Sequence, residues 1–320
     1  MNPSPSEAAS EGELLRLAQG DQVLELAPHI GGSIARWYRQ RLGDAPLHWL
    51  RPATAQALAL RDPLGMGSFP LVPWCNRIRD GRSRHGARPI VLQPNFSGSP
   101  HAIHGVGWQR PWQVQERSAH EAVLALQHRP QPGAADWPYA FEALQRFVLG
   151  PDHLAVEISL RNLSDDAMPA GIGHHPYLPH TPGTRLQARV SAMWASDAEL
   201  LPTGLVEPPF LREMAEGIEL ARLDLDNNFI GWRREARVEW PREGASLTMT
   251  AEAPLDFFVL YCPRGADHFV MEPVSNTTDW MNLAARGVGP VGGTMLAPGR
   301  TLSGRFELLC MMPADQESPA

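Results

Sequence analysis

Residues 269–282 read Phe-Val-Met-Glu-Pro-Val-Ser-Asn-Thr-Thr-Asp-Trp-Met-Asn. The bulky apolar residues at the start of this stretch predict a β-strand, and Pro273 ends it. Glu272 lies inside the strand, where a carboxylate between apolar neighbours is a local conflict typical of functional sites. A dry environment raises the pKa of a glutamate and makes it a base that works near neutral pH. The alternative is that Glu272 faces solvent.

The rest of the chain favours an all-β fold. Its 320 residues include 31 prolines and 28 glycines without a repeat period, and 43% are hydrophobic. This composition is typical of a globular protein with many short strands joined by turns. The turn-rich connections predict a large antiparallel β-sandwich and no βαβ series. We expect strands at residues 22–27, 34–38, 114–127, 141–149, 154–160, 186–194, 237–240, 246–251, 257–261 and 305–311.

The remaining segments indicate one domain with loose ends. Residues 1–20 are rich in Ser, Glu, Ala and Pro, which predicts a loose lead-in, and residues 313–320 predict a polar tail. We therefore expect a single β-sandwich domain over residues 21–312. Within it, residues 50–64 fit either a short helix or an irregular loop, and residues 201–217 fit a loop with a little helix.

Charge and residue usage exclude several classes of protein. The net charge of −7 leaves no basic surface for nucleic acid or an anionic membrane. All 28 of the Lys and Arg residues are arginine, so Schiff-base chemistry, pyridoxal-phosphate catalysis and a P-loop lysine are excluded. No Gly-x-Gly-x-x-Gly follows a strand and opens a helix, so no dinucleotide cofactor is expected.

The cysteines and the N-terminus predict a cytoplasmic protein. Cys75, Cys262 and Cys310 are far apart, odd in number and without metal-ligand spacing. They indicate a reducing compartment and no disulfide framework. The N-terminus has neither a basic region nor an apolar core, so we expect no signal peptide. No apolar run of 18 residues occurs, so we expect no transmembrane helix.

Two loops carry polar groups suited to binding. Residues 65–81 end in a cluster with Asn76 and Arg77, and residues 101–112 hold His104 with two glycines and two tryptophans. Loops on a rigid scaffold collect binding groups, and glycine lets the backbone approach a ligand. An indole face suits the C–H face of a sugar ring. A solvated arginine loop and a pair of core tryptophans are the alternatives.

A histidine pair lies in the stretch Gly171-Ile-Gly-His-His-Pro-Tyr-Leu178. Pro176 pushes His175 into an extended conformation, and adjacent strand residues face opposite sides. Only one of His174 and His175 can therefore serve a given site, and a single such histidine is often a core residue. A metal site of His174, His175 and His180 would need both adjacent histidines on one side of the strand, so the alternation of side chains argues against it.

Together these segments resemble the aldose 1-epimerase (galactose mutarotase-like) family. Each motif alone is weak, but five of them in the family's order are specific, and the form of the last is similar to a bacterial branch. The resemblance implies one β-supersandwich domain with a sugar cleft on one sheet. The matching segments are Asn76-Arg-Ile-Arg-Asp-Gly81, His104-Gly-Val-Gly-Trp108, His175-Pro-Tyr-Leu178, Asp226-Asn-Asn-Phe229, and Glu272-Pro-Val-Ser-Asn276 with Asp279 and Asn282.

The resemblance also implies an activity, that of an isomerase that interconverts sugar anomers. Glu272 would be the general base for the anomeric hydroxyl, and His175 the general acid for the ring oxygen. Only protons move in ring opening and closure, so no cofactor and no metal are expected. The partner would be a small sugar, with no nucleic acid and no membrane, and the protein a monomer or homodimer. The sugar hydroxyls would be held by His104, Asp226, Arg77 and Asn76.

The sequence departs from the galactose mutarotases at two places. The galactose mutarotases have a histidine directly after the binding aspartate, where this chain has Asn227. They have Ser or Pro, then Tyr, then Phe where this chain has Pro176-Tyr-Leu178. These departures leave the acid and the base in place but put the substrate in doubt. Galactose specificity is therefore not carried over from the resemblance.

Three other functions stay open. Glu272 and Asp226 could be the two carboxylates of a glycoside hydrolase, although Asp-Asn-Asn at Asp226 is also typical of a turn. A non-catalytic sugar-binding module is a further alternative. A hexose-6-phosphate 1-epimerase of the same fold could hold its phosphate with Arg77, Arg79, Arg82 and Arg84.

Overall fold

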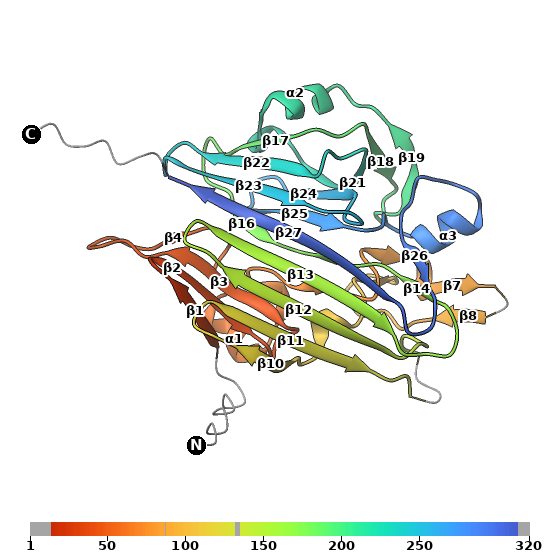
Figure 1. Cartoon of the computed structure of the whole chain (residues 1–320). Helices are drawn as coiled ribbons and strands as arrows, with labels where there is room; N and C mark the ends of the chain where they lie inside the picture. Colours follow the sequence, from red (N-terminus) through yellow and green to blue (C-terminus); the bar gives the residue numbers. More distant parts are fainter. Residues whose placement is uncertain (1–13, 87, 132–134, 313–320) are drawn as a thin grey trace, which may run out of the picture.

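The computed structural model describes residues 14–86, 88–131 and 135–312 (Figure 1). Two large antiparallel sheets dominate it, which confirms the prediction of an all-β antiparallel sandwich. The expected polar tail at 313–320 lies outside the described residues. Among the helices of the described part, none is long and apolar enough to cross a membrane.

The larger sheet has nine strands in the described part of the chain. The strand β27, dark blue in Figure 1, lies between β13 and β23, so the end of the chain joins two distant segments. In spatial order the strands are β10 (Gln113–Arg117), β11 (Glu121–His128), β12 (Phe141–Leu149), β13 (His153–Asn162), β27 (Thr301–Met311), β23 (Ala245–Ala251), β22 (Glu235–Trp240), β17 (Arg185–Ala188) and β20 (Ile218–Glu219).

The second large sheet has eight strands among the described residues and carries the residues of interest. Its centre is the antiparallel pair of β24 and β25, and the short strands β15 and β16 both pair with β25. The strands are β19 (Pro202–Val206), β18 (Ala192–Ser196), β21 (Leu225–Ile230), β24 (Phe257–Cys262), β25 (His268–Val274), β15 (Gly173–His174) and β5 (Pro70–Leu71), with β16 (Tyr177–Pro179) beside β25.

Smaller sheets and short helices complete the fold. A four-stranded sheet contains β1 (Leu15–Gln19), β2 (Gln22–Ala27), β3 (Ser33–Arg39) and β4 (Leu47–His48). Strand pairs outside these sheets join β6 (Arg77–Ile78) to β9 (Ala102–Ile103), β7 (Arg82–His85) to β8 (Arg88–Val91), and β14 (Met168–Ala170) to β26 (Thr294–Leu296). The helices are α1 (Ala55–Leu60), α2 (Phe210–Glu216) and α3 (Trp280–Ala285), with 3₁₀ turns η1 (Pro63–Gly65), η2 (Arg79–Gly81), η3 (Gly107–Gln109) and η4 (Leu220–Arg222).

Both faces of β25 are buried, and this decides where its carboxylate lies. Phe269 and Met271 point into the main core. Val270 and Val274 belong to a second apolar cluster. Because strand side chains alternate with a period of two, Glu272 shares the face of Val270 and Val274. We call this face, away from the main core, the site face.

Three sequence expectations are corrected. The prediction of a loose lead-in is wrong over residues 15–19, because Leu15 and Leu17 point into the core and this segment forms β1, which pairs with β2. Residues 1–13 of the expected lead-in lie outside the described residues. The expected strand 114–127 is the hairpin of β10 and β11. The expected strand 186–194 is two strands in different sheets, β17 and β18, since a connection at 189–191 carries the chain from one sheet to the other. Composition and apolar content do not reveal such breaks within a run.

Candidate active site

Glu272 is a buried carboxylate on the site face of β25. It lies opposite Val259 of β24 and is 2% exposed. Burial raises its pKa well above the usual value, Asp226 raises it further, and Arg77 opposes the rise. Its oxygen Oε2 is buried and has no hydrogen-bond partner among the described residues. Buried polar atoms without a partner are rare in proteins, so Oε2 is a free acceptor at this place.

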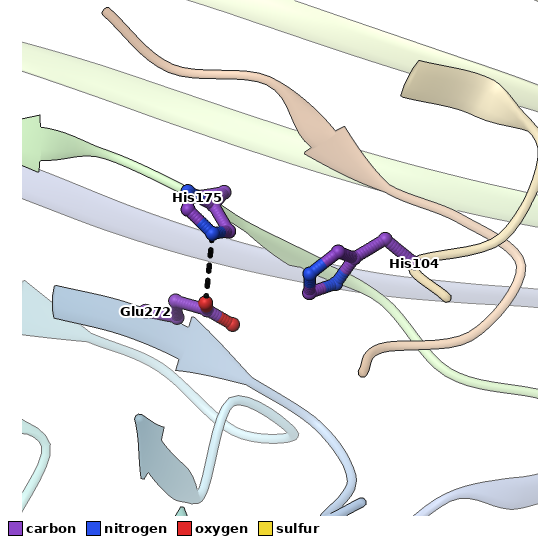
Figure 2. Close-up of side chains that lie close together, drawn as sticks. All are labelled: His104, His175 and Glu272. Carbon is purple, nitrogen blue, oxygen red and sulfur yellow. Dashed lines mark ion pairs between the residues drawn. The ribbon is translucent and has the colours of Figure 1, made fainter. Parts of the chain in front are cut away.

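His175 faces Glu272 from the short connection between β15 and β16. Its Nε2 lies 3.2 Å from Oε1 of Glu272. The dashed line in Figure 2 marks this ion pair. The backbone N–H of His175 donates to the carbonyl of Phe69, and the Phe69 ring stacks on the imidazole at 4.5 Å. Burial lowers the pKa of His175 to about 3. The sequence argument that only one of the two adjacent histidines faces this site agrees with the structure.

His104 approaches the pair from a loop. Its ring lies edge-on to that of His175, with the centroids 5.3 Å apart (Figure 2). The backbone N–H of Asn76 donates to Nδ1 of His104, and the N–H of His104 donates to the carbonyl of Asn76. Because Nδ1 accepts, the proton of the neutral ring is on Nε2, which is then a donor. Burial lowers the pKa of His104 well below its usual value and keeps the ring neutral.

Arg77 and Asp226 form the more open side of the site. Their side chains lie 3.4 Å apart and are 12% and 21% exposed. Oδ1 of Asn76 accepts from the backbone N–H and the guanidinium of Arg77, which orients that side chain. Asp226 lies in β21, opposite Tyr261, so the turn alternative for Asp226 is wrong. The six residues named from the sequence thus lie in one contiguous cluster, and their roles stay predictions.

Two further residues hold this cluster, and sequence reasoning assigned them no role. Asn276 is fully buried, and its amide bonds both the N–H and the carbonyl of Cys75, which precedes Asn76. Asp279 accepts from the N–H of Arg79, and its own N–H donates to the carbonyl of Arg77. Both lie in the stretch 269–282. They tie the Asn76–Arg77 loop to the end of β25, so one segment positions both sides of the site.

The arrangement could also hold a metal ion. Ligand atoms of His104, His175 and Glu272 lie within 4.8 Å of one another. Two imidazoles and one carboxylate are ligands that several divalent transition metals accept. The alternative set of His174, His175 and His180 is not formed, since both ring nitrogens of His174 bond to residues on the core side of its strand.

Known proteins are similar to this chain over nearly its whole length. The sequence profile of the family described as aldose 1-epimerase matches residues 13–309. An uncharacterized protein of Escherichia coli K12, YphB, is 30% identical over 302 residues, which are 91% of this chain and 97% of that protein. The crystal structure of a putative aldose 1-epimerase from the same organism has a TM-score of 0.82 at 28% identity, and covers 94% of this chain and 99% of that one.

A more distant structure shares the fold. A galactose mutarotase-like protein from Clostridium acetobutylicum has a TM-score of 0.78 at 20% identity, over 93% of this chain and 95% of that one. At this identity the likeness shows the fold alone.

Proposed function

The chain belongs to the aldose 1-epimerase family, and from this premise we propose that it interconverts the α and β anomers of a free aldose. One observation carries the proposal. A histidine and a glutamate, both buried, lie 3.2 Å apart, and the second carboxylate oxygen has no partner among the described residues. Such a pair can move two protons on one small molecule, which is all that anomer exchange requires.

The proposed reaction uses the two groups in turn. Glu272 takes the proton from the hydroxyl at C1 while His175 gives its proton to the ring oxygen. The bond from C1 to the ring oxygen breaks, and C1 becomes the carbonyl carbon of the open aldehyde. Rotation about C1–C2 presents the other face, and the ring closes with both proton transfers reversed. Each proton-transfer group contributes about 10²–10⁴-fold in rate.

Glu272 and His175 share one exchangeable proton between them. Burial raises the pKa of Glu272 and lowers that of His175, so burial disfavours both the carboxylate and the imidazolium as isolated charges. In this coupled pair the reactive state has a proton on His175 and none on Glu272. The positive charge of Arg77, which lowers the pKa of Glu272, favours that state.

The remaining residues suit the sugar hydroxyls. His104 offers its Nε2–H as a donor, and Asp226 offers acceptor oxygens beside Arg77, whose guanidinium offers donors. Asn76 orients Arg77 through two hydrogen bonds. Since Arg77 and Asp226 remain partly exposed, we propose that the sugar enters from their side.

An unphosphorylated aldose is favoured over a hexose 6-phosphate. Arg77 already lies 3.4 Å from Asp226, and Arg79 lies 3.7 Å from Asp197. These two guanidinium groups therefore have carboxylate neighbours that would repel a phosphate. We also propose a cytoplasmic monomer or homodimer without nucleic-acid or membrane partners, and the three buried, unpaired cysteines support the reducing compartment.

The test is anomer interconversion of freshly dissolved α-D-glucose, α-D-galactose and glucose 6-phosphate, followed by polarimetry or NMR. We expect acceleration above the spontaneous rate for at least one free hexose and less for the phosphate. No acceleration with any sugar, together with saturable sugar binding, would instead support a binding module. Release of nitrophenol from nitrophenyl glycosides would support a hydrolase.

The pH profile distinguishes the role of Glu272. Arg77→Met removes a charge that lowers the Glu272 pKa, and Asp226→Asn removes one that raises it. As the base, Glu272 must be deprotonated, so the acidic limb of kcat/KM follows its pKa. We expect that limb to move to higher pH in Arg77→Met and to lower pH in Asp226→Asn. If the basic limb moves instead, Glu272 is the acid and His175 the base.

A further inference from the structure

A chain of hydrogen bonds runs through the core directly behind the proposed site. Nδ1 of His174 pairs with the hydroxyl of Ser68, and Nε2 pairs with Oε1 of Gln145 at 3.1 Å. The amide nitrogen of Gln145 donates to the carbonyl of Gly32 at 3.1 Å. Ser68, His174 and Gln145 are all fully buried. Buried polar groups that are fully paired rigidify a core.

The direction of every bond in this chain follows from its last member. Gln145 uses its NH₂ on the carbonyl of Gly32, so its Oε1 must accept. His174 therefore carries its proton on Nε2, and Nδ1 accepts from the Ser68 hydroxyl. This is the neutral tautomer, and burial lowers the pKa of His174 to about 3, which keeps it neutral. The side chain thus has a single orientation with both nitrogens paired.

These hydrogen bonds link three separate sheets. His174 lies in β15 of the eight-stranded sheet, Gln145 lies in the middle of β12 of the nine-stranded sheet, and Gly32 immediately precedes β3 of the four-stranded sheet. The polar chain therefore fixes the short strand β15 relative to the rest of the sandwich.

The strand β15 is short and lies next to two prolines. It has two residues, and the residue opposite His174 is Pro70, which has no N–H to donate. Pro176 follows His175 and has no N–H either. The two prolines remove two backbone donors beside His175, while the N–H groups of His175 and Tyr177 donate to the carbonyls of Phe69 and Gly67. The side-chain bonds of His174 add an anchor on the core side to these backbone bonds.

The same two segments carry the site on their other face. Ser68 and His174 bond on the core side, while their neighbours Phe69 and His175 stack on the site side at 4.5 Å. A displacement of His174 is therefore passed through one peptide unit to His175, and a displacement of Ser68 is passed through Phe69, whose ring stacks on the imidazole of His175. Because proton transfer needs hydrogen-bond distance, a shift of about 1 Å has a large effect on rate.

We propose that His174, clamped between Ser68 and Gln145, is a positioning residue that sets the distance of His175 from Glu272. The proposal rests on the proposed function for its kinetic consequence only. The clamp acts from the side of the strand that a substrate does not touch, so it affects turnover and leaves the sugar-hydroxyl contacts of Arg77 and Asp226 in place.

The test compares two buried glutamines. Gln145→Leu leaves Nε2–H of His174 without an acceptor. Gln22→Leu is the matched control, since Gln22 is buried in β2, accepts from Nε1 of Trp49 and donates to Cys310. We expect both variants to lose stability, but only Gln145→Leu to lose about 10- to 100-fold in kcat, with KM within about twofold of wild type. Both are assayed well below their Tm.

Ser68→Ala tests the other end of the clamp and covers a failure of Gln145→Leu to fold. It is expected to lower kcat in the same way, without raising KM. A wild-type kcat in Gln145→Leu or Ser68→Ala, or an equal loss in Gln22→Leu, would overturn the proposal.

A readout without substrate separates this proposal from the proposed function. The side-chain ¹⁵N signals of His175, observed by NMR, should shift in Gln145→Leu and Ser68→Ala and stay unchanged in Gln22→Leu. Unchanged His175 signals in both clamp variants refute the clamp whether or not the wild type is an epimerase. Shifted signals with an inactive wild type would refute the proposed function and keep the positioning of His175.

Discussion

Glu272→Gln is expected to lower kcat for anomer interconversion by about 10²–10⁴-fold, to near the spontaneous rate. Glutamine has the shape of glutamate and can still bond His175, but it cannot take a proton from the anomeric hydroxyl. The measurement is polarimetry with the best sugar found for the wild type. Glu25→Gln is the control, because Glu25 is a partly buried, paired glutamate in a different sheet and should keep full activity.

The same variant is expected to keep or gain stability. Since the pKa of Glu272 is raised above 4.5 in the folded protein, the folded state binds the proton more tightly than the unfolded state. Stability of the wild type is therefore lost as pH rises above about 4.5, and the glutamine variant escapes this loss. We expect its Tm to exceed that of wild type by an amount that grows as pH rises from about 4.5 and levels off above the raised pKa of folded Glu272. Retained activity would remove Glu272 from the mechanism, and a fall in Tm would indicate a structural role.

Gly105→Ala is expected to destabilise the protein by about 2–5 kcal/mol and to abolish activity. Gly105 has φ of +75°, and a Cβ there would lie 1.8 Å from the carbonyl oxygen of Val72. That oxygen accepts from the N–H groups of Val106 and Gly107, so both bonds would be disturbed. His104 precedes Gly105 and would move with it. Denaturant unfolding followed by fluorescence measures the loss of stability.

Gly98→Ala is the matched control for this steric argument. Gly98 has φ of +78°, nearly the same φ as Gly105. Apart from Gly98 and its two chain neighbours, no described residue has an atom within 4 Å of the place that an added Cβ would occupy. The two variants share the strain of a positive φ and differ in the collision with Val72. Equal effects of the two would show that backbone strain alone, and not the close approach at Val72, governs this loop.

Several strands can be predicted from the sequence because the alternation of apolar and polar side chains depends only on neighbouring residues. Residues 22–27 coincide with β2, and the predicted strand at 141–149 coincides with β12. The composition of residues 1–20 predicts a loose segment and hides β1, although Leu15 and Leu17 alternate. The run 186–194 predicts one strand because apolar content does not show that the chain changes sheets between β17 and β18.

The sequence predicts the six residues of the candidate site but not the residues that hold them in place. The order of the five motifs indicates the six residues, and the structure brings them into one cluster. The supporting residues act through buried or partly buried hydrogen bonds to partners 29 to 201 residues away; they are Asn276, Asp279, Ser68 and Gln145. No local pattern encodes such a partner, so only the packed structure identifies it.

The sequence by itself determined that Glu272 lies in an apolar strand and that His174 and His175 face opposite sides, because side-chain alternation depends on adjacent residues alone. Only the tertiary structure decided which histidine meets Glu272, since that depends on β15 pairing with β25 about 100 residues later in the chain. It also decided the shifted pKa values, which arise from burial by segments that are distant in sequence.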